Sequence, residues 1–351
     1  MKANIKIPVE IVFTPKWWNS HLGINFDKGF FFDPNRRVED EMNMRYYLYE
    51  RFHIEGLGEK EKIRKPVIGP IHLAAGYIIP QLFGCPIIYH KDGPPDILPL
   101  NISDEDALKL KVPDFKNMYP TNDIIQMMDI LEKEYGYIEG DIDWSGVLNH
   151  ALDIRGQQIF MDMYDDSKVA KHLFEVIYES ILEFAKYIKK RTGSTSISVN
   201  RQTKNFDPPI NLHSNCSVQM ISNDMYEKHL LQYDIGLSKE LQPYGIHHCG
   251  NNMDNVALGY SKVPNVSFFD VGYGSDIKKC RTYLKEAFFN LRLSPVKMLN
   301  DTKEQVKDDI YKMIEQNGGI DNMGLCCINM DEKTPDENIR AIYEVAKELR
   351  K

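Results

Sequence analysis

The chain has 351 residues, of which 42% are hydrophobic, and 43 Lys and Arg against 51 Asp and Glu give it a formal net charge of −8. This length fits one large α/β domain or two ordinary ones, and the acidic balance argues against nucleic acid or an anionic membrane as a main partner. The sequence has no apolar run near the roughly 20 residues that a membrane span needs, and its N-terminus lacks the apolar core and cleavage site of a signal peptide. We therefore expect a cytoplasmic protein whose six cysteines are free thiols.

The first 65 residues differ in composition and pattern from the rest of the chain. They begin with the aromatic-rich segment KWWNSHLGINFDKGFFFDP (16–34) and continue with RRVEDEMNMRYYLYERF (36–52), which has a helical pattern. We expect residues 1–65 to form a partly helical N-terminal extension that packs on a catalytic domain of residues 66–351.

From about residue 136 onward, short apolar runs alternate with helical patterns. YGYIEGDIDW (135–144) is typical of a strand, and DDSKVAKHLFEVIYESILEFAKYIKKRTG (165–193) is a long amphipathic helix. The same alternation continues to the last pair, MGLCCINMD (323–331) with TPDENIRAIYEVAKELR (334–350). It predicts a parallel sheet covered by helices, and the length favours a (β/α)8 TIM barrel. A doubly wound open sheet is the alternative, but no strand ends in a Gly-x-Gly-x-x-Gly loop.

Polar and metal-binding side chains follow the expected strands at nearly every end, which is where parallel α/β folds carry their functional residues. In chain order these candidates are Glu139, Asp141, Asn200, Arg201, His213, Asn215, Cys216, His247, His248, Cys249, Asp270, Arg292, Cys326, Cys327 and Asn329.

His247 and Cys249 lie two residues apart in GIHHCGNN (245–252), so on a strand both side chains project from one face. Imidazole and thiolate are preferred zinc ligands, and a third ligand from another strand end would leave the fourth tetrahedral position open, as in catalytic zinc sites. The Cys326–Cys327 pair is the natural donor, and one of the two can face the mouth of the barrel. The alternative is a buried histidine bonded to the backbone, with thiols packed as small apolar groups.

GIHHCGNN and GLCCINMDEKTPDENIRAIYEV (324–345), with GCPIIYHKDGPPDI (84–97), resemble the uroporphyrinogen decarboxylase superfamily. The likeness covers roughly residues 65–350 and is closer to the zinc-dependent methyltransferase branch, which includes methylcobamide:coenzyme M methyltransferases. In that branch a His-x-Cys and a distant Cys hold zinc on a (β/α)8 barrel, which implies His247, Cys249 and Cys326 as ligands. Cys326 is preferred to Cys327 on family spacing, and Cys216 is a further candidate. The arginine-rich N-terminal motif of true uroporphyrinogen decarboxylases is missing, which argues against porphyrinogen decarboxylation.

The resemblance implies an enzyme that moves a methyl group to or from the cobalt of a corrinoid, held by a separate corrinoid-binding protein. In one direction zinc acts as a Lewis acid on a small methylated substrate while cob(I)alamin attacks the methyl carbon. In the other direction zinc binds and deprotonates a thiol, which takes the methyl group from methylcobalt. A zinc-free decarboxylase and a non-catalytic corrinoid or metal carrier are the remaining alternatives.

The N-terminal aromatics offer a way to choose a substrate. If Trp17 and Trp18, with Phe30, Phe31 and Phe32, cover the barrel mouth, they can sandwich an aromatic ring, which favours an aryl methyl ether. The alternative, which we favour, is that these side chains pack the extension against the barrel.

The other polar residues at the strand ends are expected to act around the metal ion. Glu139 and Asp141 are expected to exchange a proton with the leaving group, and Asp270 to orient a ligating histidine. His213 and Asn215 are expected to line the substrate pocket, and Arg292 to hold an anionic substrate group such as a carboxylate. Capping, loop hydrogen bonds or ion pairs are the structural alternatives for these polar residues.

Overall fold

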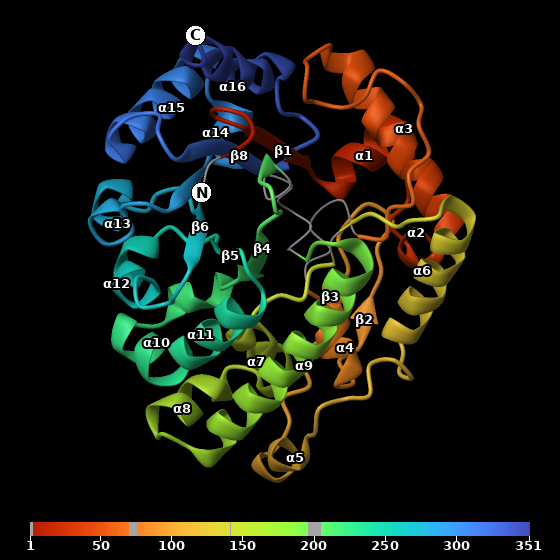
Figure 1. Ribbon diagram of the computed structural model, residues 1–351, viewed down its shortest axis with the longest axis vertical. Coiled ribbons are helices and arrows are strands. Elements are labelled where there is room, and N and C mark those ends of the chain that lie inside the picture. Colours follow the sequence, from red (N-terminus) through yellow and green to blue (C-terminus); the bar gives the residue numbers. More distant parts are fainter. Residues whose placement is uncertain (1–2, 70–75, 141, 196–204) are drawn as a thin grey trace.

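The computed structural model describes residues 3–69, 76–140, 142–195 and 205–351 (Figure 1). Within these ranges, six parallel strands form one curled sheet in the order β1-β8-β7-β6-β5-β4. They are β1 (Val9–Phe13), β4 (Asn211–Ser214), β5 (Tyr244–His248), β6 (Val266–Val271), β7 (Phe288–Arg292) and β8 (Met323–Met330). A separate parallel bridge joins Val67 to Glu139.

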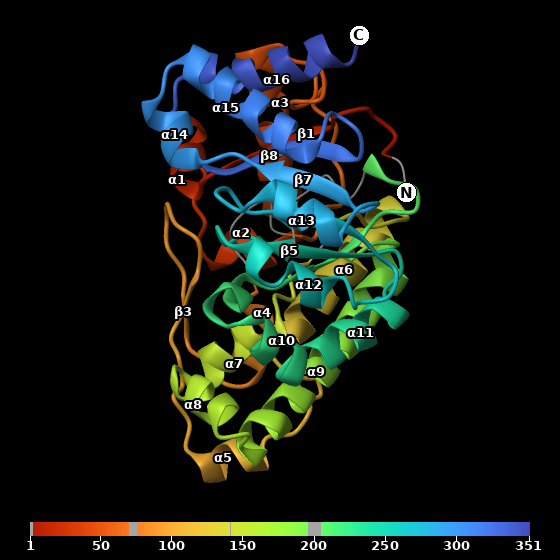
Figure 2. The ribbon, with the colours of Figure 1, turned by 90° about the vertical axis from the view of Figure 1, so that its left-hand side faces the viewer.

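The strand order is the one expected of a barrel. The first strand of the chain lies beside the last, with Val9 opposite Leu325, and β4 to β8 follow one another across the sheet in chain order. Helices surround the strands on the outside in both views (Figures 1 and 2). The predicted fold class, a TIM barrel, is therefore confirmed.

The helices follow the strands as the apolar periodicity predicts. They are α1 (Pro15–Leu22), α2 (Lys28–Phe32), α3 (Pro34–Phe52), α4 (Ile78–Leu82), α5 (Asp104–Lys109), α6 (Thr121–Tyr135), α7 (Val147–Arg155), α8 (Gln158–Tyr164), α9 (Lys168–Thr192), α10 (Asn223–His229), α11 (Leu231–Glu240), α12 (Ala257–Tyr260), α13 (Ile277–Tyr283), α14 (Pro295–Asn300), α15 (Lys303–Asn317) and α16 (Asp336–Leu349). Two short 3-10 helices, η2 (Cys216–Met220) and η3 (Met253–Asn255), and a small hairpin, β2 (Ile87–Ile88) with β3 (Asp96–Ile97), complete the elements. No helix among the described residues has both the length and the apolar character to cross a bilayer.

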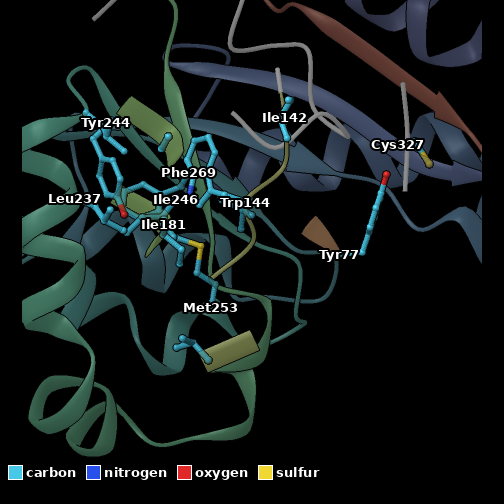
Figure 3. Close-up of a cluster of buried hydrophobic side chains, with 14 of the residues drawn as sticks. Tyr77, Ile142, Trp144, Ile181, Leu237, Tyr244, Ile246, Met253, Phe269 and Cys327 are labelled. Carbon is cyan, nitrogen blue, oxygen red and sulfur yellow. The ribbon is translucent and has the colours of Figure 1, made fainter. Parts of the chain in front are cut away.

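Alternate residues of each strand face different environments. The outward side chains join the main core with the helices, as Figure 3 shows for Ile246 of β5 and Phe269 of β6 beside Leu237 of α11. The inward residues Leu212, Phe268 and Phe288 form a separate apolar cluster inside the barrel. Two positions further along these strands, polar side chains replace the apolar ones.

The N-terminal segment, which the sequence predicts to pack on the barrel as an extension, contributes one strand to the sheet. β1 lies within residues 1–65, yet it pairs with β8 along most of its length. Its sequence, VEIVF, is short and adjoins the aromatic segment, so the pattern did not identify it as a strand. The helical expectation for residues 36–52 is met by α3.

Candidate metal centre

Three side chains that can bind a metal ion converge at the ends of β4 and β5. One ligand atom from each of Cys216, His247 and Cys249 lies within 4.8 Å of the other two. Ser214 is opposite His247 in the β4–β5 register, and the backbone N–H of Asn215 donates to the carbonyl of His247 at 2.8 Å. The chain then leaves β4 for the 3-10 helix η2, whose first residue is Cys216. The turn after β4 thus brings the third sulfur to the His-x-Cys pair.

The imidazole of His247 is oriented by a carboxylate on the next strand. Oδ2 of Asp270 lies 2.5 Å from Nδ1 of His247, and Nδ2 of Asn290 donates to the other carboxylate oxygen at 2.7 Å. The three residues are in register across β5, β6 and β7. Because Nδ1 is used by Asp270, Nε2 is the nitrogen that can bind a metal.

The electrostatics of the cluster favour a thiolate. A hydrogen bond from Cys216 lowers the pKa of Cys249 to about 3, against the opposing effect of burial and with further help from His247. The pKa of Cys216 is raised well above its usual range by the same hydrogen bond and by burial. Burial lowers the pKa of His247, but hydrogen bonds with Asp270 and Cys249 outweigh it and raise the pKa to about 9. These contacts favour the thiolate form of Cys249, which is the form in which a cysteine binds a metal ion.

Arg292 places a buried positive charge beside this cluster. Its Nη1 lies 3.3 Å from Nε2 of His247, and the residue is 8% exposed. Among the described residues, no Asp or Glu forms a salt bridge with this guanidinium. Arg292 thus retains donor capacity next to the three ligand groups.

The two C-terminal cysteines lie apart from the three-residue cluster. Cys326 is in register with Arg292, but it is 1% exposed and packs with Val12 and Ile328. Its sulfur is not among the three groups that lie within 4.8 Å of one another. Cys327 belongs to the outer core, and its Sγ is 3.7 Å from the carbonyl of Leu293. The structure therefore groups Cys216, rather than the expected Cys326, with His247 and Cys249.

The acidic residues after the second bridge segment have different environments. The backbone of Glu139 pairs with Pro66 and Ile68, and Asp141 lies outside the described residues. Asp143, which the sequence reasoning missed, is 2% exposed and accepts a hydrogen bond from the N–H of Ser145 at 2.7 Å. Burial raises its pKa to about 6, although the positive charge of His247 opposes this. Its place two residues after Asp141 is the signal that would have identified it.

His213 and Asn215 contact a buried carboxylate outside the barrel. Nδ2 of Asn215 donates to Oδ2 of Asp234 at 2.7 Å, and Nε2 of His213 lies 3.6 Å from Oδ1 of the same residue. The other nitrogen of His213 accepts a hydrogen bond from Nε1 of Trp144 at 3.1 Å. His248 similarly contacts Tyr260, at 3.0 Å. The residues that contact His213 and Asn215 in the structure are therefore part of the packed protein interior.

The N-terminal aromatic side chains are mostly part of the core. Trp17 and Trp18 are 0% and 2% exposed, and Phe30 and Phe31 are also buried. Trp17 packs against Phe13 in a tilted ring contact, with ring centroids 4.2 Å apart. These contacts match the packing interpretation of the aromatic segment.

One comparison with a solved structure agrees with the fold. A methyltransferase from Methanosarcina mazei is similar over 98% of this chain and 94% of its own, with a TM-score of 0.68 and 14% sequence identity. A B12-independent methionine synthase from Shewanella sp. W3-18-1, in complex with selenomethionine, matches over 99% of this chain and 98% of its own, with a TM-score of 0.49 and 11% identity.

The sequence itself was also compared with known proteins and families. A search of curated proteins found no match. The family profile described as Uroporphyrinogen decarboxylase (URO-D) matches residues 71–349, which is most of the chain and includes β4 to β8. The chain therefore belongs to the uroporphyrinogen decarboxylase family.

Proposed function

We propose that this protein is a zinc-dependent methyltransferase, which moves a methyl group between a small methylated substrate and the cobalt of a corrinoid on a partner protein. The observation that carries the proposal is the convergence of Cys216, His247 and Cys249 within 4.8 Å. The likeness of the fold to a methyltransferase from Methanosarcina mazei is consistent with it.

The donor set fits a catalytic zinc ion. Two sulfurs and one imidazole nitrogen are the ligands that zinc prefers, and three protein ligands leave one position for substrate. The hydrogen bond that Nδ1–H of His247 donates to Asp270 fixes the imidazole ring, as carboxylates commonly do for metal-binding histidines. When bound, zinc would supply Lewis acidity toward the heteroatom that carries or receives the methyl group.

Two cysteines are candidates for the third zinc ligand. Cys216 is favoured by proximity in the structure. Cys326 is favoured by the resemblance, and its register with Arg292 puts it on the same face of the neighbouring strand. We propose Cys216 and retain Cys326 as the competing ligand, which metal analysis of the two single variants will separate.

Other residues of the chain would act on the substrate. Arg292 offers a buried guanidinium beside His247, suited to binding a carboxylate or another anionic group. Asp143 is a candidate to exchange a proton with the leaving group, because its carboxyl is buried and electrostatically coupled to His247. Glu139 and Asp141 remain the candidates expected from the sequence for this role.

Our proposal for the substrate names a chemical class. An aryl methyl ether was favoured by the N-terminal aromatics, but the burial of Trp17 and Trp18 removes that support. It remains the first compound to test because Arg292 is suited to the carboxylate of a methoxybenzoate. The competing direction, transfer from methylcobalt to a thiol, uses the same three ligands.

The direct test uses free cobalamin in place of the partner protein. Zinc-loaded protein is mixed with cob(I)alamin and a methoxybenzoate, and the appearance of methylcobalamin is followed by absorbance. The reverse assay mixes methylcobalamin with a small thiol. We expect one of the two reactions to require Cys249, so Cys249→Ala should abolish it while Cys280→Ala, which removes a buried cysteine on α13, should not. Equal rates for wild type and Cys249→Ala would contradict the proposal.

A further inference from the structure

A buried carboxylate behind β4 gathers polar side chains from several elements. Asp234 of α11 is 3% exposed. Its Oδ2 accepts hydrogen bonds from the hydroxyl of Tyr226 at 2.5 Å and from Nδ2 of Asn215 at 2.7 Å, and its Oδ1 accepts one from the hydroxyl of Tyr244 at 3.0 Å. His213 faces Oδ1 at 3.6 Å. Asp234 thus links α10, α11, β4 and β5 at one point.

This carboxylate is joined to the candidate metal centre through Asn215. The side chain of Asn215 binds Asp234, and its backbone N–H donates to the carbonyl of His247 at 2.8 Å. Asn215 has φ −112° and ψ 42°, so the extended strand ends at this residue and the next residue, Cys216, opens η2. The direction of the Cys216 side chain therefore depends on how Asn215 is held.

The bond between Asp234 and Asn215 is well suited to holding this turn. An amide that donates to an ionised carboxylate makes a stronger and shorter hydrogen bond than a neutral pair. Both partners are buried, so water does not compete for the bond. Removing the donor would leave one carboxylate oxygen with a single partner and would remove the side-chain bond that ties this turn to α11.

We propose that Asp234, acting through Asn215, is a positioning residue for the metal centre that fixes Cys216 beside His247 and Cys249. The proposal rests on the proposed function, because it requires Cys216 to be a zinc ligand. It adds a functional role to a network that would otherwise be assigned to fold stability alone. Substitutions that break the link should weaken metal binding more than those that break another bond to the same carboxylate.

The experiment measures Zn²⁺ affinity of the full chain by competition with a chromophoric chelator. Asn215→Asp has the same size as the native residue but removes the donor and sets two carboxylates against each other. We expect it to lower the affinity about 10- to 100-fold, as losses in the outer shell of metal sites commonly do. Tyr244→Phe is the matched control, because it removes a bond to the other oxygen of Asp234; its affinity should stay within about threefold of wild type.

An exchange variant tests whether the pairing itself matters. Asn215→Asp combined with Asp234→Asn restores an amide opposite a carboxylate, and it should recover the affinity to within about threefold of wild type. With Co²⁺ as the probe, the sulfur-to-metal charge-transfer absorbance per bound ion should fall in Asn215→Asp and return in the exchange variant. A change limited to fold stability would not move this absorbance.

The outcomes separate this inference from the proposed function. Wild type that binds zinc, together with Asn215→Asp of equal affinity, would overturn the inference and leave the metal centre standing. Wild type that binds no zinc would overturn both. If Asn215→Asp does not fold, the exchange variant decides: recovered affinity and absorbance support the inference, and a tenfold or greater loss overturns it.

Discussion

Asp270 on β6 and His247 on β5 are joined by a 2.5 Å contact between a carboxylate oxygen and Nδ1 of the imidazole. The pair is in register across the two strands and is buried inside the barrel. This contact fixes both the rotation of the ring and the nitrogen that remains for a metal ion.

Loss of the Asp270 charge should weaken the metal centre. Asp270→Asn keeps the size of the side chain but is a poorer acceptor for the imidazole N–H, so we expect Zn²⁺ affinity to fall about 10- to 100-fold. The measurement is chelator competition at neutral pH. Asp254→Asn, which removes a partly exposed carboxylate paired with Lys279, is the control and should have native affinity. Native affinity in Asp270→Asn would rule out its orienting role.

Arg292 should discriminate substrates by charge. Replacing it with Gln removes the guanidinium, and we expect KM for a methoxybenzoate to rise about 10- to 100-fold, the range for losing a hydrogen bond to a charged group. KM for the uncharged methoxybenzene should change much less. Steady-state kinetics of the two compounds with wild type and Arg292→Gln makes the comparison, and equal changes for both would contradict anion binding by Arg292.

Trp17 should matter for stability rather than for substrate binding. It is fully buried and packs against Phe13, so Trp17→Ala should cost about 3–5 kcal/mol of unfolding free energy. Tyr164→Ala, at a residue that is 77% exposed, should change it by no more than about 0.5 kcal/mol. Chemical denaturation measures both values. A near-neutral Trp17→Ala with a raised substrate KM would instead favour a role in the active site.

Burial of His213 predicts a pH dependence of stability. Burial lowers the pKa of His213 to about 4, against an ordinary value of 6.5, so the unfolded chain takes up this proton more readily than the folded chain. The stabilising contribution is complete above pH 6.5 and is lost as the pH falls from 6.5 to 4. Over that window the unfolding free energy of wild type should fall by about 3 kcal/mol more than that of His213→Gln. Parallel pH profiles for the two proteins would show that His213 is not buried as a neutral imidazole.

The sequence predicts the C-terminal part of the barrel well because its signals are local. β6, β7 and β8 are short apolar runs, each followed by an amphipathic helix. β1 was missed because what makes it a strand is its pairing with β8, at the opposite end of the chain. A five-residue segment carries too little periodic signal to reveal that partner.

The sequence predicts the positions of the candidate site residues only where the backbone is extended as in a strand. His247 is on β5 and Cys249 directly follows the last residue of that strand, so the two-residue spacing still predicts a shared face, and both join the cluster. Cys216 follows a residue that leaves the extended conformation, so strand alternation no longer predicts its direction. His213 alternates with Ser214, the register partner of His247, and this explains why it contacts Asp234 on the outer side. The end of a strand predicts where a residue lies in the fold, whereas the face of the sheet on which its side chain lies depends on the strand register.

The most direct test of the account is the zinc content of purified wild type, Cys249→Ala, Cys216→Ala and Cys326→Ala, measured by elemental analysis. We predict about one zinc ion per wild-type chain, marked loss in Cys249→Ala and Cys216→Ala, and retention in Cys326→Ala. Loss in Cys326→Ala with retention in Cys216→Ala would transfer the third ligand to β8 and contradict the assignment made from the structure. Equal zinc in all four proteins, or none in any, would contradict the metal centre itself.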